Sequence, residues 1–177
     1  MDGERIGALV GSIGGLVFIL VNAGGLPGPA PLIARCLGVA AFAFVVWYAV
    51  LRPRPGRAET GPPPREAMRV YWICVGAMGL AIPLGAAAIN NVLDLPELTV
   101  CWVVLVVGAH FLPFAKAFEA PVFAPLAWTL MALAVLGGTL TLALAVQAAA
   151  WAAVLAGAAL LGFSAFGART GGRLRSA

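Results

Sequence analysis

Six long apolar runs constrain this chain more than any other feature of its sequence. Each run is long enough to cross about 30 Å of hydrocarbon as a helix that rises about 1.5 Å per residue. The runs lack the strict alternation of polar and apolar residues that the strands of a membrane barrel need. The sequence therefore predicts an all-α fold, with residues 1–177 forming one polytopic transmembrane helical bundle. The expected spans are 6–23, 32–51, 70–89, 98–115, 122–144 and 149–166.

The composition excludes the main alternatives to a membrane protein. Hydrophobic residues make up 62% of the chain, charged residues make up 10%, and the mean hydropathy is +1.00. Soluble domains carry about 25% charged residues, and disordered chains combine high charge with low hydrophobicity. One histidine and three cysteines, none of them in a C-x-x-C pair, do not supply a usual zinc set. We therefore expect no metal and no cofactor.

The basic residues predict how the chain is threaded. With six spans, both termini lie on the same side as the connections after the second and fourth runs, and ten of the eleven Lys and Arg residues fall there. Basic connections stay in the cytoplasm. We therefore expect a multi-pass protein of the cell membrane with cytoplasmic N- and C-termini and a flexible cytoplasmic loop over 52–69. The same placement explains the net charge of +4 without a nucleic-acid partner. The partner that we expect is the lipid bilayer.

The first run has an alternative interpretation as a cleaved signal peptide, which would leave five spans. Val21-Asn22-Ala23 resembles a cleavage site with small residues. Against cleavage, acidic residues flank Arg5, so the amino-terminal segment is not clearly positive. The run also carries glycines at a spacing of four, which lets another helix approach closely. These glycines are Gly7, Gly11 and Gly15.

The fourth run contains the most informative polar side chain, His110. It is the one ionisable side chain well within a predicted span, and such residues tend to face the interior of a bundle. Pro113 lacks an N–H and crowds the carbonyl of Ala109. One interpretation is an imidazole that titrates or binds a ligand at a kinked helix. The other is a neutral histidine hydrogen-bonded to a neighbouring helix, with Pro113 only shaping the helix end.

The string H-F-L-P-F-A at 110–115 resembles an H-F-L-P-[LF]-A motif of small bacterial integral membrane proteins of uncharacterised function. The end of the first run, residues 16–24, resembles theirs as well. Phe114 stands where that family usually has Leu. The resemblance implies a bacterial polytopic membrane protein and implies no reaction.

Further candidate positions lie near the span ends and in the third run. Pro83 interrupts the third run and frees the carbonyl of Gly79, which suits a hinge or a discontinuous helix. On the non-cytoplasmic side we expect Arg35 to pair with a carboxylate of Asp94 or Glu97. At the cytoplasmic end, Lys116 is expected to pair with Glu119 or to extend toward the membrane surface. The polar residues expected to ring the non-cytoplasmic side are Asn22, Arg35, Asn90, Asn91, Asp94, Glu97 and Gln147.

These features favour two functions. The first is transport of a small solute or a proton, with the short chain acting as a homo-oligomer. Against transport, no Asp or Glu lies within a predicted span, so the carboxylates that usually relay protons or sodium ions through a transporter are missing. The second is a non-catalytic accessory role, in which the glycine-rich first run packs against a larger membrane partner. An enzyme is not expected, because no catalytic or metal-binding motif is present.

The threading predicts a labelling pattern on intact cells. In a chain whose three cysteines are replaced by alanine, Asn91→Cys should react with a membrane-impermeant maleimide. Arg57→Cys should react only after the cells are permeabilised, because its loop is cytoplasmic. Labelling of Arg57→Cys on intact cells would contradict the predicted orientation.

Overall fold

The computed structural model describes residues 3–52 and 64–170. The described residues contain six helices long and apolar enough to cross a membrane and no strand, which confirms the all-α bundle. Short turns extend three of them: η1 (Ala23–Gly25), the π-helical η2 (Val46–Leu51) and η3 (Pro96–Leu98). The long helices are α1 (Gly3–Asn22), α2 (Ala30–Val45), α3 (Arg65–Asn91), α4 (Thr99–Ala117), α5 (Phe123–Ala143) and α6 (Gln147–Thr170).

The cytoplasmic loop predicted over 52–69 is shorter than expected. The structure begins α3 at Arg65, so Arg65 and Arg69 belong to a helix. The segment 53–63, with Arg54 and Arg57, lies outside the described residues. Pro64 stands immediately before α3 in an extended conformation, and a proline at that position is compatible with the start of a helix.

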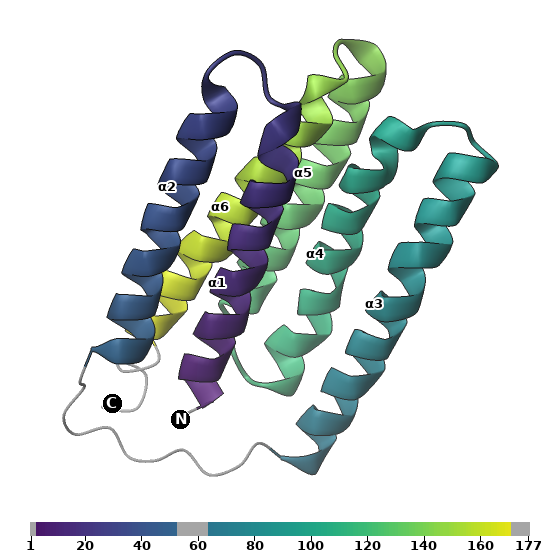
Figure 1. Cartoon of the computed structure of the whole chain (residues 1–177). Coiled ribbons are helices and arrows are strands. Elements are labelled where there is room, and N and C mark those ends of the chain that lie inside the picture. Colours follow the sequence, from purple (N-terminus) through teal and green to yellow (C-terminus); the bar gives the residue numbers. More distant parts are fainter. Residues whose placement is uncertain (1–2, 53–63, 171–177) are drawn as a thin grey trace.

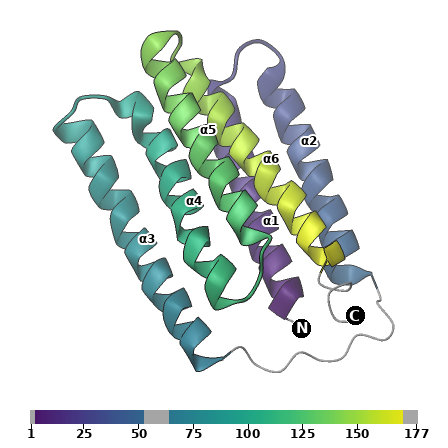
Figure 2. The ribbon, with the colours of Figure 1, turned by 180° about the vertical axis from the view of Figure 1, so that it is seen from behind.

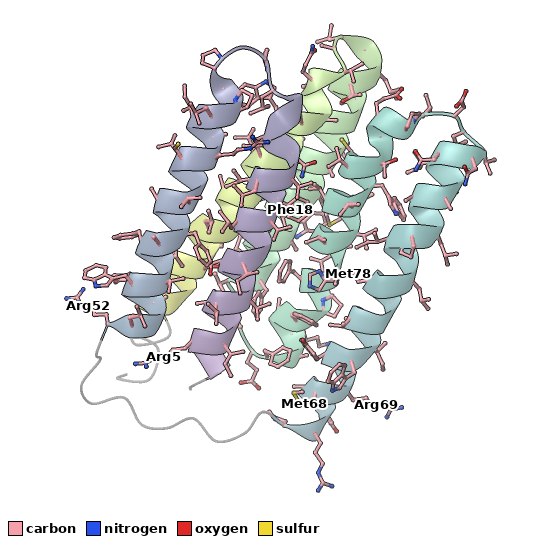
Figure 3. All side chains as sticks on the ribbon, viewed as in Figure 1. Arg5, Phe18, Arg52, Met68, Arg69 and Met78 are labelled. Carbon is pink, nitrogen blue, oxygen red and sulfur yellow. The ribbon has the colours of Figure 1, made fainter. Side chains whose placement is uncertain are left out.

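The six helices run alternately up and down, so α1 begins at the same end of the bundle at which α6 ends (Figure 1). Arg5, Arg52 and Arg69 are all found at this end (Figure 3). We call it the basic end and the other the far end. The far end carries the α1–α2, α3–α4 and α5–α6 connections (Figure 1). Grouping of the basic side chains at one end is the arrangement that the charge pattern required.

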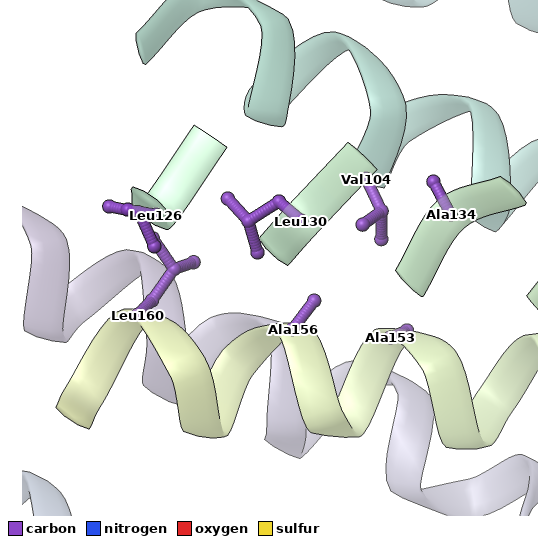
Figure 4. Packing of buried hydrophobic residues seen from close by; sticks show 7 residues of the cluster. All are labelled: Val104, Leu126, Leu130, Ala134, Ala153, Ala156 and Leu160. Carbon is purple, nitrogen blue, oxygen red and sulfur yellow. The ribbon is translucent and has the colours of Figure 1, made fainter. Parts of the chain in front are cut away.

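Helix α6 holds the bundle together. It packs against α1, α5, α4 and α2, and it crosses the bundle between α1 and α5 (Figures 1 and 2). The main hydrophobic core lies where α4, α5 and α6 meet, and it combines leucine and valine with alanine so that the helices interlock (Figure 4). Its buried members are Val104, Leu126, Leu130, Ala134, Ala153, Ala156 and Leu160.

Glycines make the contact between α1 and α6 close. A Cβ added at Gly15 would lie 2.7 Å from the carbonyl oxygen of Gly157, and one added at Gly157 would lie 2.5 Å from the carbonyl oxygen of Gly15. A Cβ at Gly11 would meet the Ser164 hydroxyl in the same way, whereas Gly7 has no neighbour within 4 Å. The spacing of four therefore does bring a helix close, and that helix belongs to the same chain.

Helix α3 packs extensively on α4 alone and forms one edge of the bundle (Figures 1 and 2). The Trp102 indole fills the space that a side chain at residue 85 would need, because Gly85 has none. Its Nε1–H donates a hydrogen bond of 3.0 Å to the carbonyl oxygen of Ala81. Trp102 therefore joins α4 to α3.

The glycine contact predicts different effects of alanine at two neighbouring positions of α1. Gly15→Ala should lower the unfolding temperature in detergent and destabilise the fold by about 1–3 kcal/mol, because its Cβ would collide with backbone rather than with a flexible side chain. Gly14→Ala, whose Cβ would have no neighbour within 4 Å, should leave the unfolding temperature unchanged or raise it. Equal effects would contradict a close α1–α6 contact.

Candidate functional site

A groove of about 730 Å³ lies between α1 and α4. Both helices pack on α6, and neither packs extensively on the other. The start of α6 supplies the floor through Gln147, Ala149 and Ala150. The groove therefore exists because α6 holds α1 and α4 apart. It begins at the far end, beside η1 and η3, and reaches Val107 along α4.

The groove has a polar mouth at the far end. Asn22, Glu97, Thr99 and Gln147 line it there, so three members of the predicted polar ring come together with a threonine. The Asn22 Nδ2 donates to the Phe18 carbonyl oxygen at 2.9 Å, which leaves its Oδ1 as an acceptor. Among the described basic residues, none forms an ion pair with Glu97, the one charged side chain that lines the groove. The mouth therefore carries net negative charge.

Below the mouth the walls are apolar and rich in valine. Val17 and Val21 line the groove from α1, and Val100, Val103 and Val107 line it from α4. Val17 is 52% exposed and Val21 is 72% exposed, so the groove is open along its side as well as at its mouth. Branching at Cβ restricts valine in a helix to one dominant rotamer. These side chains therefore form fixed walls and do not fold inward to fill the space.

His110 does not line the groove, but it follows Val107, the last α4 residue that does, by about one turn on the face of α4 that carries Val103 and Val107. The positions 103, 107 and 110 follow the helical repeat, and helical side chains lean toward the N-terminus of their helix. The imidazole of His110 therefore leans toward Val107, and its Nδ1 contacts the carbonyl oxygen of Val107. Because a carbonyl only accepts, Nδ1 carries the proton of the neutral ring. Nε2 is then the nitrogen with a free lone pair, and it has no hydrogen-bond partner among the described residues.

The hydrogen bond between His110 and Val107 shows on which helix the partner of His110 lies. The alternative interpretation placed the partner of His110 on a neighbouring helix, but the partner is a carbonyl of α4 itself. That carbonyl belongs to Val107 and is not the Ala109 carbonyl that Pro113 leaves without its usual donor. Helix α4 nevertheless continues through Pro113 to Ala117, and Pro113 is exposed.

An aromatic cluster separates His110 from the basic end. Phe114 lies at its centre, 5.2 Å from the His110 ring, and stacks on Tyr71 of α3 with ring centroids 5.7 Å apart. Phe118 and Phe123 approach Phe114 edge-on at 5.5 and 6.1 Å. Phe114 is buried, and edge-to-face and stacked rings add stability beyond their buried area. The cluster joins α3, α4 and α5 on the side of His110 away from the groove mouth.

Several predicted site residues lie away from the groove. The predicted ion pair of Arg35 is wrong, because α2 and the α3–α4 connection lie at opposite edges of the bundle (Figure 1). Pro83 is exposed on α3, which passes through it without a break. Lys116 and Asp94 are exposed, and Lys116 forms no ion pair with Glu119. Asn90 is connected to the groove, since its Oδ1 accepts a hydrogen bond from the Thr99 hydroxyl at 3.1 Å.

The described residues contain no group of three His, Cys, Asp or Glu side chains that would hold a metal ion. Cys36, Cys74 and Cys101 are free thiols. The polar groups that line the groove are thus one carboxylate, amides and a hydroxyl, with the imidazole of His110 about one turn beyond its end. These groups bind and exchange protons, and they do not form a nucleophilic or metal-assisted catalytic set.

The comparisons with known proteins add no relative. No protein-family model matches the chain, no curated protein matches it, and no solved structure matches it. The resemblance of residues 110–115 to the H-F-L-P-[LF]-A proteins therefore stays a prediction. The class that the fold defines is a polytopic helical membrane protein.

The Nδ1 contact predicts the tautomer of the single histidine. With ¹⁵N-histidine as the labelled amino acid, spectra at a pH where the ring is neutral should show the proton on Nδ1 and a bare Nε2, because the Val107 carbonyl can only accept. His110→Gln should remove the signals and confirm their assignment. The more common tautomer, with the proton on Nε2, would contradict the arrangement.

Proposed function

We propose that this chain carries a small solute or a proton across the membrane, and that the groove between α1 and α4 is the part of the path open to the far end. The observation that carries the proposal is the continuity of this groove from a polar mouth to Val107, whose carbonyl holds the imidazole of His110. An ionisable side chain at that depth is expensive. A position about one turn beyond the end of an open groove would give this cost a function.

The roles of the residues follow from their places along the groove. Glu97, Asn22 and Gln147 receive the solute at the mouth, where they replace part of its hydration. The valines guide it toward the membrane midplane, where charged groups are least tolerated. His110 then offers Nε2, which accepts either a proton or a hydrogen bond.

The aromatic cluster supplies the barrier in this state. Phe114 and its neighbours lie between His110 and the basic end, so the path is open at the far end and closed at the basic end. Transport then requires α3 and α5 to move relative to α4 at Phe114. Helix α3 is suited to such a movement, because α4 is the one long helix on which it packs extensively.

A second candidate function is attachment to a larger membrane partner. The observation that favours it is the exposed face of α3, where Leu80 is 66% exposed and a Cβ at Gly76 or Gly79 would have no neighbour within 4 Å among the described residues. The glycines of α1, which suggested this role in the sequence, contribute less to it. Gly11 and Gly15 are already in contact with α6.

Proton flux into liposomes tests the transport function. The purified chain, reconstituted with a pH-sensitive dye inside, should acidify the vesicles under a potassium-diffusion potential, and His110→Ala should reduce the rate by at least about tenfold if the imidazole carries the proton. Leu136→Ala, on the exposed face of α5, is the matched control and should transport as the unchanged chain does.

Each result of this experiment has a defined meaning. Full flux in His110→Ala, with normal insertion, would refute the role of the imidazole. Absence of flux in the unchanged chain, together with co-purification of one defined partner from native membranes, would favour the accessory role instead.

A further inference from the structure

The groove is about as long as one leaflet of a bilayer is thick. From Glu97 at the mouth to Val107 the chain advances ten residues, which corresponds to about 15 Å along the helix axis. The hydrocarbon core of a membrane is about 30 Å thick, so the groove extends from one membrane surface to about the midplane. A molecule that fills it lies parallel to the lipid chains of the far-end leaflet.

The polarity of the groove changes once along this length. The carboxylate of Glu97 and the amides of Asn22 and Gln147 are confined to the mouth, and Val17, Val103 and Val107 line the deeper part. A ligand complementary to both parts has one polar end and one hydrocarbon end. A small hydrophilic solute would leave the valine walls without a partner, and a simple hydrocarbon would leave the carboxylate without one.

The charge of the mouth specifies the polar end. The chain carries a net charge of +4, yet the one charged side chain that lines the groove is acidic. Arg35, the basic residue predicted as its partner, lines a separate depression on α2 together with Cys36 and Val39. A carboxylate at a partly dehydrated site favours a cationic donor, because charge-assisted hydrogen bonds are stronger than neutral ones.

The open side of the groove specifies the route of entry. Val17 and Val21 line the groove and are largely exposed along α1. If α1 spans the bilayer, a hydrocarbon chain enters sideways from the lipid without passing the polar mouth. The fixed rotamers of the valines keep this side open before the ligand arrives.

We propose that the groove between α1 and α4 binds a cationic amphiphile drawn from the far-end leaflet, with its ammonium group at Glu97 and its hydrocarbon chain along the valines to Val107. The proposal rests on the proposed function, because it names the substrate class of the same groove. It makes Glu97 the residue that selects the head group and Val103 the residue whose size sets the width of the chain-binding part.

Photo-crosslinking tests this proposal on the full chain in nanodiscs of phosphatidylcholine. The probe is a dodecylammonium that carries a diazirine near the end of its chain, and the labelled positions are read by mass spectrometry after digestion. We expect labelling of Val103 and Val107 to exceed that of Val135 on the exposed face of α5. Unlabelled dodecylammonium should compete with the probe for the groove, and dodecanoate should not.

Two pairs of variants assign the two halves of the ligand. Glu97→Gln should reduce labelling of the groove on the order of tenfold, the loss of a charge-assisted hydrogen bond, and Asp94→Asn, an acidic residue at the same end that does not line the groove, should not. Val103→Trp should block labelling at Val107, whereas Val135→Trp should not. All four variants should retain the unfolding temperature of the unchanged chain.

The outcomes separate this proposal from the transport function. Equal labelling by a dodecanoate probe, or equal losses in Glu97→Gln and Asp94→Asn, would overturn the proposed head-group selection. Labelling spread evenly between the groove and α5 would overturn the site itself. Selective binding without any flux would preserve the site and refute transport, and proton flux without binding would preserve transport and refute the amphiphile.

Discussion

The contact between α1 and α6 is the constraint on which the rest of the structure depends. Gly15 and Gly157 place two backbones so close that neither position has room for a methyl group. Lipid chains are as apolar as leucine, so helices in a membrane gain little from burying apolar surface and depend on close packing. With α1 fixed in this way and α4 held on the other side of the α5–α6 core, a space remains between α1 and α4. The groove is thus a consequence of how α6 packs.

The sequence predicted the class of fold well, because the hydrocarbon core of a membrane allows few kinds of backbone structure. An apolar run in lipid must satisfy its backbone hydrogen bonds internally, so run length and composition alone lead to helices. The same reasoning placed the basic side chains at one end. The glycine spacing also predicted that another helix would approach Gly7, Gly11 and Gly15. The structure brings α6 to Gly11 and Gly15, whereas a Cβ at Gly7 would have no neighbour within 4 Å among the described residues. A spacing of four does not identify the partner helix.

The candidate site was less predictable, because it depends on which helices are neighbours. Asn22, Glu97 and Gln147 were expected among seven polar residues at one side of the membrane, and the groove brings these three together. Arg35 was expected with them, and it lies apart because α2 and α3 are separated by the rest of the bundle. The valine walls were missed. Their signal was present as Val100, Val103 and Val107 at helical spacing, but the same pattern is ordinary in any apolar helix.

The pairing of α1 with α6 has a consequence for the order in which the protein is made. The most extensive interface between helices in the described chain joins α1 to α6. During synthesis Gly11 and Gly15 of α1 stay without their α6 partner until more than a hundred further residues have been made. Contacts so distant in sequence form late. The core and the groove therefore form only once α6 is inserted, and synthesis that stops before α6 leaves a protein with neither its main core nor the floor of its groove.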